Sequence, residues 1–487
     1  MPEAASRPGT PSLACPDPLA SLDPLLRGWL PRQRWFAGKG RPVTGFSTVS
    51  ATELLAPGAG GAPGLLHLLV RAEQPPPGDA DCYQLLLGVR GSLPPHLAPA
   101  LIGRASTGPL AGRTVYDALH DPEAAEALLT ALRDRARIGT LRFERAPGGD
   151  IGRGLTPRLL GAEQSNSSVV YGDTLILKLF RRIVPGLNPD LELPHALART
   201  GSPRVPAPVA WMLAEPADPA VATDPAVAAD PGAAGTGPEP HPDEVLVLGV
   251  LQPFLRGATD GWELALADLA RGGDFGAEAR ALGRATAEVH TALARALPTV
   301  TLGRPRVEEL AGGMARRLTA AVAAVPELRP HARGLRAAFD ALAALAVDGR
   351  VWDAQRVHGD LHLGQCLRAP SGEWSLIDFE GEPARPLAER RTPQPVARDI
   401  AGMLRSFDYA ARSHRPWAPL WADRCRAAYC AGYADVSGSD PRREAVLLRA
   451  YEADKAVYEV MYEARHRPDW LPVPLAAIHR LADPDPV

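Results

Sequence analysis

The chain of 487 residues is long enough for roughly two to four domains with ample hydrophobic cores. A hydrophobic content of 46% and a charged content of 22% are ordinary for a globular protein. The net charge of −3 excludes a global basic field that would attract nucleic acid or an anionic membrane. The 5 cysteines are scattered without a CxxC pair, which favours a reduced, cytoplasmic protein. No stretch reaches the roughly 20 apolar residues that cross a bilayer.

The first part of the chain predicts a leader followed by a small α+β domain. Residues 1–18 are polar and Pro-rich, so we expect a disordered leader that lacks the apolar core of a signal peptide. Within residues 19–150, a short amphipathic helix over 22–30 precedes apolar runs separated by Gly and Pro, which predict an antiparallel sheet. A helix is expected over 123–137. Trp35 and Phe36 read as a packed anchor, because Lys39 lacks the spacing of a phosphate loop.

Residues 151–255 predict a β-rich region with a phosphate-binding character. A small polar turn, comprising Gln164, Ser165, Asn166, Ser167 and Ser168, leads into a strand, and Gly172-Asp173 is typical of a hairpin. The next strand contains Lys178 among apolar residues. A covering loop followed by a strand lysine is how kinase small lobes hold nucleotide phosphates, although a solvent-facing lysine is an equally good interpretation. Glu192, in a predicted helix start at 188–192, is the candidate partner of Lys178.

A tract over 214–243 has no Lys or Arg and is rich in Ala, Pro, Asp and Gly, which predicts a low-complexity insertion. Residues 256–487 then become helical. Apolar residues recur at helical spacing over 263–269, 277–296, 307–325 and 335–346. His290 lies on an apolar face and is expected to be a core histidine. We therefore predict a helical region that contains the stretch described next.

The stretch 357–382, VHGDLHLGQ followed by WSLIDFEGE, contains the groups that phosphoryl transfer needs. Gln365 lies five residues after Asp360, and Asp378 opens a Asp-Phe-Glu triplet after a predicted strand. Protein kinases place a metal-binding Asn five residues after the catalytic Asp and a metal-binding Asp in DFG. The spacing predicts Asp360 as the base, with Gln365 and Asp378 as Mg²⁺ ligands. Asp399, at a later helix start, is expected to accept hydrogen bonds from the catalytic-loop backbone.

Near the C-terminus, residues spaced three and four apart place carboxylates, a lysine and tyrosines on one helix face. Such a face suits a sugar, whose hydroxyls accept and donate hydrogen bonds while its ring stacks on an aromatic side chain. A solvated face with i,i+4 ion pairs is an equally good interpretation. The residues in question are Tyr451, Asp454, Lys455, Tyr458, Glu459, Tyr462 and Glu463.

With these motifs in place, the chain resembles the actinobacterial maltokinases, relatives of the aminoglycoside phosphotransferases. The matching stretches are WLPRQRWFAGKGR at 29–41, EQSNSSVVYGDTLILKLFRR at 163–182, NPDLE at 188–192, HGDLHLGQ at 358–365, LIDFEGEPARPLAER at 376–390 and RDIAGMLRSFDYAA at 398–411. The resemblance implies an α+β, bilobal, protein-kinase-like fold. Its parts would be an extra N-terminal α+β cap at 19–150, a β-rich N-lobe at 151–255 and a helical C-lobe at 256–487.

The resemblance implies ATP-dependent phosphorylation of maltose at its anomeric hydroxyl, for α-glucan synthesis. It assigns Lys178, Glu192 and the turn from Gln164 to Ser168 to the nucleotide, and His362 to a position beside the transferring phosphate. Glu380, in place of the Gly of DFG, would support the metal. Arg405, Asp408, Lys455 and Glu459 would bind the sugar. Some relatives are fused to a trehalose synthase, which is not present in this chain, so any such partner would act in trans.

Two alternatives remain open at this stage. A kinase of the same fold could act on another small molecule, such as glucosamine or an aminoglycoside. A polycationic aminoglycoside would call for a strongly acidic pocket, which the mixed charges of Lys455 and Glu459 do not favour. The second alternative is a non-catalytic nucleotide-binding scaffold, against which stands the presence of every polar group that catalysis needs.

Overall fold

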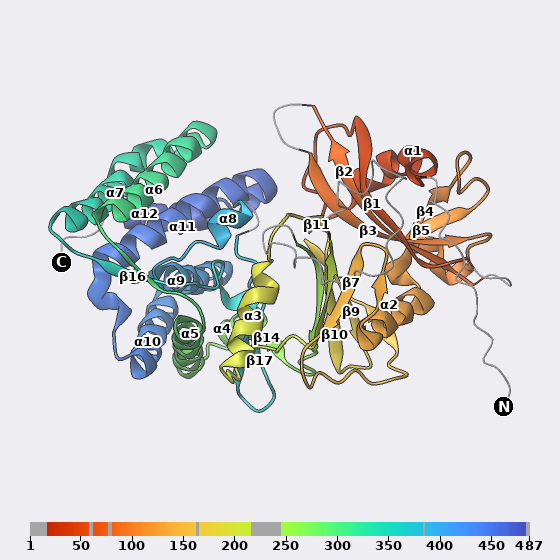
Figure 1. The fold of residues 1–487 in the computed structure, drawn as a ribbon. Coiled ribbons are helices and arrows are strands. Elements are labelled where there is room, and N and C mark those ends of the chain that lie inside the picture. The colour runs from red at the N-terminus through yellow and green to blue at the C-terminus, as the bar shows by residue number, and fades with distance from the viewer. Residues whose placement is uncertain are drawn as a thin grey trace, which may run out of the picture. The chain divides into compact units, whose positions relative to one another are not determined.

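The fold is described in a computed structural model of the chain. The structure describes residues 17–57, 62–75, 80–161, 165–215, 245–382 and 385–483. Most of the expected leader, the expected insertion and Gln164 therefore lie outside the described residues. The chain divides into two compact units, Met1–Leu187 with Val209–Phe254 and Asn188–Pro208 with Leu255–Val487. Each unit is described by itself (Figure 1).

The first unit contains two antiparallel sheets. One has the order β1-β2-β3-β5-β4 with β11 paired to β3, and the other the order β6-β7-β12-β13-β10-β9-β8. The strands of the first sheet are β1 (Gly45–Leu55), β2 (Gly64–Glu73), β3 (Asp81–Arg90), β4 (Leu101–Arg104), β5 (Thr114–Asp117) and β11 (Arg182–Ile183). Those of the second are β6 (Arg137–Ile138), β7 (Leu141–Arg145), β8 (Pro157–Leu159), β9 (Asn166–Tyr171), β10 (Leu175–Phe180), β12 (Ala210–Ala214) and β13 (Leu246–Pro253).

Two helices, α1 (Leu19–Trp29) and α2 (Pro122–Asp134), complete this unit (Figure 1). Helix α1 buries Leu22, Leu26 and Trp29, spaced three and four apart, against the first sheet. Phe36 is 2% exposed and packs on the ring of Tyr83, which confirms the anchor expected there. The short amphipathic helix and the antiparallel sheet are confirmed as well.

The expected hairpin at Gly172-Asp173 joins β9 to β10 in register. Both residues have positive φ, 56° and 52°, as the two central residues of a type I′ turn do, and the Thr174 N–H donates to the Tyr171 backbone oxygen at 3.1 Å. Glycine reaches this conformation without strain, and Asp is among the few other residues that tolerate it. The turn thereby fixes the register that places Lys178 directly opposite Ser168.

The second unit is mainly helical, and most of its apolar side chains form one core. In Figure 1, α5 lies against α10, and α11 lies between α9 and the pair α6 and α7. Its helices are α3 (Pro189–Arg199), α4 (Gly261–Ala270), α5 (Gly276–Ala296), α6 (Arg304–Ala324), α7 (Ala332–Val347), α8 (Leu387–Arg390), α9 (Ala397–Ser413), α10 (Pro419–Ser437), α11 (Ala445–His466) and α12 (Pro472–Ala482). Its short strands are β14 (Thr259–Asp260), β15 (Val300–Leu302), β16 (Trp352–Ala354), β17 (Cys366–Arg368) and β18 (Trp374–Leu376).

These units differ in two places from the boundaries expected from the sequence. Strands β6 and β7, expected in the cap at 19–150, belong to the seven-stranded sheet, because β7 pairs with β12 along its whole length. Helix α3, expected in the N-lobe at 151–255, belongs to the second unit, because Leu193 and Leu197 are buried in its core. Among the described residues, no helix is both long and apolar enough to cross a membrane.

Candidate active site

The loop that contains Asp360 is held in place by one buried carboxylate. Asp399, in the first turn of α9, accepts hydrogen bonds from the backbone N–H groups of His358 at 2.7 Å and Gly359 at 2.8 Å. It also accepts one from Nε2 of His290 at 3.0 Å. The structure confirms the role expected of Asp399. His290 is 3% exposed, as expected of a core histidine, and Tyr433 contacts its Nδ1 at 3.0 Å.

The charge on Asp399 is stabilised where it lies. Burial alone would raise the pKa of this carboxyl group, but the hydrogen bond from His290 and the bond from the Gly359 backbone outweigh it and hold the pKa below its ordinary value. Gly359 has φ 85°, a conformation that favours glycine. The conformation just before Asp360 is therefore set by a glycine and an ionised anchor.

Four contacts join this loop to the stretch that contains Asp378. The ring of His358 bonds to the backbone oxygen of Ile377 at 2.9 Å and packs 4.6 Å from the ring of Phe379. The Ile377 N–H donates to the backbone oxygen of Gln365 at 3.0 Å. Strands β17 and β18 between them form the expected hairpin. These contacts place Gln365 beside Asp378, whose Oδ2 accepts a hydrogen bond from Nε2 of Gln365 at 2.9 Å.

Asp360 lies beside a half-buried cation from helix α11. Nζ of Lys455, on α11, is 2.7 Å from Oδ1 of Asp360 and 3.2 Å from Oε1 of Glu382. The side chain of Asp360 remains 19% exposed, and that of Lys455 is 16% exposed. Asp360 thus keeps an accessible oxygen, while its charge is partly balanced by the ammonium group.

Glu382 fixes Lys455 in turn. It also pairs with Arg385 and with Arg398, the latter at 3.2 Å. Burial would raise the pKa of Glu382, but Lys455, Arg398 and Arg385 outweigh it and lower the pKa. Burial would lower the pKa of Lys455, but Asp360 and Glu382 raise it. Both groups are therefore charged at neutral pH, and the cations around Glu382 are shared with Asp360 and Asp454.

His362 is a neutral ring next to this cluster. Burial lowers its pKa, against the opposite influence of Asp360. Its Nδ1 accepts a hydrogen bond from the Gly364 N–H at 3.1 Å, so the ring proton is on Nε2. His362 can therefore donate a hydrogen bond from Nε2.

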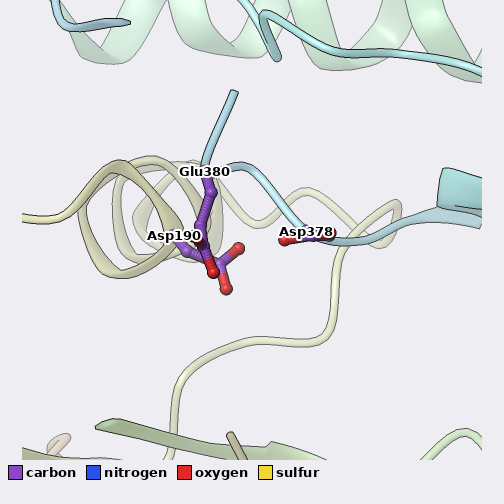
Figure 2. Close-up of side chains that lie close together, drawn as sticks. All are labelled: Asp190, Asp378 and Glu380. Atoms are coloured by element: carbon purple, nitrogen blue, oxygen red, sulfur yellow. The ribbon is translucent and has the colours of Figure 1, made fainter. Parts of the chain in front are cut away.

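Three carboxylate groups, from parts of the chain far apart in sequence, lie close together near Gln365. Oxygen atoms of Asp190, Asp378 and Glu380 lie within 4.8 Å of one another. Figure 2 shows Asp190 on helix α3 and the other two on the loop after β18. Asp190 also accepts a hydrogen bond from the Phe379 N–H at 2.6 Å. Asp190 is an acidic residue at a helix start, and nothing in its local sequence indicates this long-range contact.

These groups fit a magnesium ion by their chemistry. Mg²⁺ prefers carboxylate and other oxygen ligands, one or two of them from the protein. Asp378 has a left-handed backbone, φ 65°, which is uncommon for a residue other than glycine and typical of functional positions. Asp378, with Glu380 and Asp190, would hold the ion. The side-chain oxygen of Gln365 belongs to the same amide group whose nitrogen contacts Asp378.

The predicted phosphate-binding residues of the first unit lie at one end of the seven-stranded sheet. Lys178 on β10 is opposite Ser168, and its Nζ lies 5.7 Å from the ring centre of Phe180. Ser167 accepts a hydrogen bond from Nε of Arg181 at 2.8 Å. Ser165 lies next to the side chain of Asn166, at 3.2 Å. Their role in nucleotide binding stays a prediction, and Gln164 lies outside the described residues.

Glu192 lies in the second unit, on α3, and its carboxylate pairs with Arg356 at 2.7 Å. The expected pairing of Glu192 with Lys178 stays a prediction. The Glu192–Arg356 contact itself ties α3 to the segment just before the catalytic loop.

The predicted sugar-binding residues separate into two places. Lys455 lies at Asp360, as described above. Arg405 is 1% exposed, and its guanidinium donates to Glu459 at 2.7 Å and to Asp408 at 2.9 Å. This burial argues against direct contact between Arg405 and a sugar, because its donors are already used inside the protein. Sequence spacing placed these residues on neighbouring turns but gave no sign of which turn faces the loop.

Comparison with solved structures defines the class of protein. A glucosamine kinase in complex with glucosamine, ADP and inorganic phosphate superimposes with a TM-score of 0.62 at 24% identity, covering 95% of this chain and 98% of the other. The chain thus has a kinase-like α+β fold, as expected.

Sequence comparisons identify a matching domain and related proteins. Residues 29–121 match the maltokinase N-terminal cap domain. The glucosamine kinase of Mycolicibacterium smegmatis is 28% identical over 346 residues, 67% of this chain and 79% of that protein. That of Streptacidiphilus jiangxiensis is 29% identical over 344 residues, 64% and 70% respectively. Residues 29–121 are thus similar to a maltokinase cap, the fold of the chain is kinase-like, and both of these relatives are kinases.

Proposed function

We propose that the protein is an ATP- and Mg²⁺-dependent kinase that phosphorylates maltose at its anomeric hydroxyl, giving maltose 1-phosphate for α-glucan synthesis. The observation that carries the proposal is the ion pair between Asp360 and Lys455, 2.7 Å long, on a loop held by Asp399. It provides a general base and, beside it, a permanent positive charge. The maltokinase cap at residues 29–121 supports maltose as the acceptor.

In this proposal Asp360 accepts the proton of the anomeric hydroxyl group. The acceptor oxygen then forms a bond to the γ-phosphorus, and the bond between that phosphorus and the bridging oxygen of ADP breaks. Positioning and charge stabilisation account for most of the rate in such reactions. His362 donates its Nε2–H to an oxygen of the transferring phosphoryl group. Lys178 and the turn Ser165 to Ser168 are assigned to the nucleotide phosphates.

A bound Mg²⁺ ion would neutralise charge on the β- and γ-phosphates. Asp378 and Glu380 would hold it, with Asp190 close by and Gln365 orienting Asp378 through the 2.9 Å hydrogen bond. Asp190 has a second task that needs no metal, since it binds the Phe379 N–H and so fixes the loop between the two carboxylates.

The charges at Asp360 favour a neutral acceptor over a cationic one. Lys455, Arg385 and Arg398 surround Glu382, so that carboxylate is not available to an ammonium group. Lys455 also pairs with Asp360, and Arg385 with Asp454. A second ammonium about 4 Å from Lys455 would be repelled by roughly 1 kcal/mol even at the dielectric constant of bulk water. Maltose has no charge and avoids this cost.

Glucosamine is the second candidate acceptor, because the two relatives and the superimposed structure are named glucosamine kinases. Both candidates use the same base and metal groups, so only the acceptor separates them. A trehalose synthase acting in trans, as a separate source of maltose, stays part of the maltose proposal.

An acceptor screen tests the proposal. The purified full chain is incubated with ATP and Mg²⁺ and with maltose, glucose, glucosamine or an aminoglycoside, and ADP release is measured. The phosphorus NMR spectrum of the maltose product should show an anomeric phosphate. Phosphorylation of glucosamine with maltose ignored would replace maltose as the acceptor, and no ADP release with any acceptor would favour the nucleotide-binding scaffold.

A further inference from the structure

A cavity in the helical unit is lined by three arginines that the proposed reaction does not use. It measures about 80 Å³ and opens to solvent between α9, the start of α10, and α12. Roughly 10–15 Å³ is enough for one water, so the space suits several waters or a group the size of phosphate. The charged side chains that line it are Arg405, Asp408, Arg412, Asp423 and Arg480.

The arginines in this cavity differ in what balances their charge. Arg405 pairs with Glu459 and Asp408, and Arg480 pairs with Asp408. Asp408 also accepts a hydrogen bond from Arg426 at 3.4 Å. Asp408 is thus shared among three guanidinium groups and has little capacity for a fourth. Because Arg405 also pairs with Glu459 and Arg426 with Glu452, the charges of these two arginines are largely balanced within the protein.

Arg412 is not part of this network of ion pairs. Within the described residues it makes no ion pair, and its guanidinium lies 3.5 Å from the ring centre of Trp417. Partial burial, with Arg480 and Arg405 nearby, lowers the pKa of Arg412 below its ordinary value. The planar fork of Arg412 is therefore held by an aromatic ring, next to a cavity, without a carboxylate to bind.

The cavity also has a surface for the rest of a ligand. Trp417 is 49% exposed although it is a large aromatic side chain. Small apolar side chains form the remaining wall, namely Pro419, Ala422, Val473, Ala476 and Ala477. A ligand with an anionic head and a compact body would find a charged contact and an apolar one side by side.

The cavity lies toward the C-terminal end of α9, whereas the catalytic loop is anchored by Asp399 at the start of that helix. Asp399, which holds that loop, and Arg412 both lie on α9, at opposite ends of the helix. At 1.5 Å per residue, the two positions are about 20 Å apart along the axis.

We propose that this cavity is a second binding site, which takes the oxyanion group of a small metabolite, a phosphate or a carboxylate, on Arg412 and Arg480. Guanidinium groups bind such oxyanions through paired, charge-assisted hydrogen bonds. The body of the metabolite lies against Trp417. The proposal of this second site does not depend on which acceptor the kinase phosphorylates.

Calorimetric titration of the full chain tests the proposal. The probes are inorganic phosphate, glucose 6-phosphate and citrate, each at matched ionic strength in chloride, with saturating ADP and Mg²⁺ so that the nucleotide site is filled. We expect at least one probe to bind, and Arg412→Gln to weaken it about 10-fold or more, the usual effect of losing a charge-assisted hydrogen bond. Comparing the affinities for inorganic phosphate and citrate shows whether the site prefers a phosphate or a carboxylate group.

Arg306→Gln is the matched control, because Arg306 is a 72% exposed arginine on α6, far in sequence from the cavity. Arg412→Lys keeps the charge and should retain part of the affinity. Circular dichroism confirms that each variant folds. Equal affinity in Arg412→Gln and Arg306→Gln, or no binding of any probe beyond chloride, would overturn the proposal.

A second measurement uses the tryptophan itself. The chain has 9 tryptophans, so the fluorescence change on adding the bound probe is compared between the unchanged chain and Trp417→Phe. We expect the change to disappear in the variant. A change that persists would show that the probe binds elsewhere, and would count against the cavity.

Discussion

Two buried histidines show how differently the two units use polar groups in their interiors. His67, in the cap sheet, is 0% exposed and bonds to the neutral amide of Gln84 at 2.9 Å. His290, in the helical unit, is 3% exposed and bonds to the carboxylate of Asp399 at 3.0 Å. The first pair joins two sheets, because Gln84 donates to the backbone oxygens of Phe180 and Leu248. The second holds the loop that contains Asp360.

The difference is one of charge. Burial lowers the pKa of His67 to about 4, although the bond to Gln84 opposes it, so the His67 ring is neutral at pH 7. The pKa of Asp399 is also lowered, but because its hydrogen bonds outweigh burial, so its charged form is kept. A neutral pair is enough for a structural contact. A loop that positions a base gains from an anchor that two backbone N–H groups and a histidine can share.

The largest effect is expected from removing the base without disturbing its anchor. Asp360→Asn should lower kcat by about 10²–10⁴-fold, since a positioned general base contributes that much. The asparagine keeps the shape, so nucleotide binding and the unfolding midpoint should change little. Steady-state kinetics and ADP calorimetry measure both.

Asp353→Asn is the matched control for this variant, because Asp353 is an exposed aspartate on β16. Turnover in Asp360→Asn equal to that of the control would remove Asp360 from its role as base. A loss of stability as large as that of Asp399→Asn, the variant of the loop's anchor discussed next, would show that Asp360 has a structural role.

The anchor variant gives the next effect. Asp399→Asn should destabilise the protein by roughly 3 kcal/mol, because a buried carboxylate that serves three donors is replaced by a group that can accept fewer hydrogen bonds. Urea unfolding measures the difference, again with Asp353→Asn as the control. A change below about 0.5 kcal/mol would mean that the loop does not depend on Asp399.

Local sequence patterns predict the scaffold around these two histidines well. Helical periodicity indicates α4 to α7, the Gly-Asp turn sets β9 against β10, and the position of Asp399 after the catalytic motif indicates its task. Each depends on residues close in sequence or on one spacing rule. What the sequence leaves out is long-range packing.

The missed contacts show why. The bond from the Phe379 N–H to Asp190 spans 189 positions, and that from Lys455 to Asp360 spans 95. A helix face tells which side chains neighbour each other on that helix, but not which face meets the loop. Lys455 and Glu459 therefore read as one sugar-binding face, whereas one meets Asp360 and the other meets Arg405.

As the pH falls, the contribution of the His67–Gln84 pair to stability should be lost before that of the His290–Asp399 pair. His67 has an ordinary pKa of 6.5 and about 4 when folded, so the unfolded chain binds the proton more readily between these values. Stability is therefore lost as the pH falls from 6.5 towards 4, by up to roughly 2–3 kcal/mol between pH 7 and pH 4.5. Asp399 works in the other window: its contribution is present above its ordinary pKa of 3.8 and is lost only below it.

His67→Gln should flatten this dependence, because glutamine does not titrate. Urea unfolding of the unchanged chain and the variant at pH 7 and pH 4.5 gives the difference in slope. His96→Gln is the control, since His96 is exposed in the same unit. The same pH dependence in His67→Gln and in the control would mean that acid destabilisation arises at other groups.

The smallest effect concerns the cation beside Asp360. Lys455→Gln removes the charge that disfavours an ammonium acceptor, so glucosamine should compete with maltose more strongly, with an inhibition constant lowered by about 10-fold. Lys39→Gln, an exposed lysine of the cap, is the control. The variant also loosens Asp360 and should lower kcat, but the ratio of the two acceptor affinities removes that contribution. An unchanged ratio would show that Lys455 only positions Asp360, and the choice between a neutral and a cationic sugar would then have to be made by other residues.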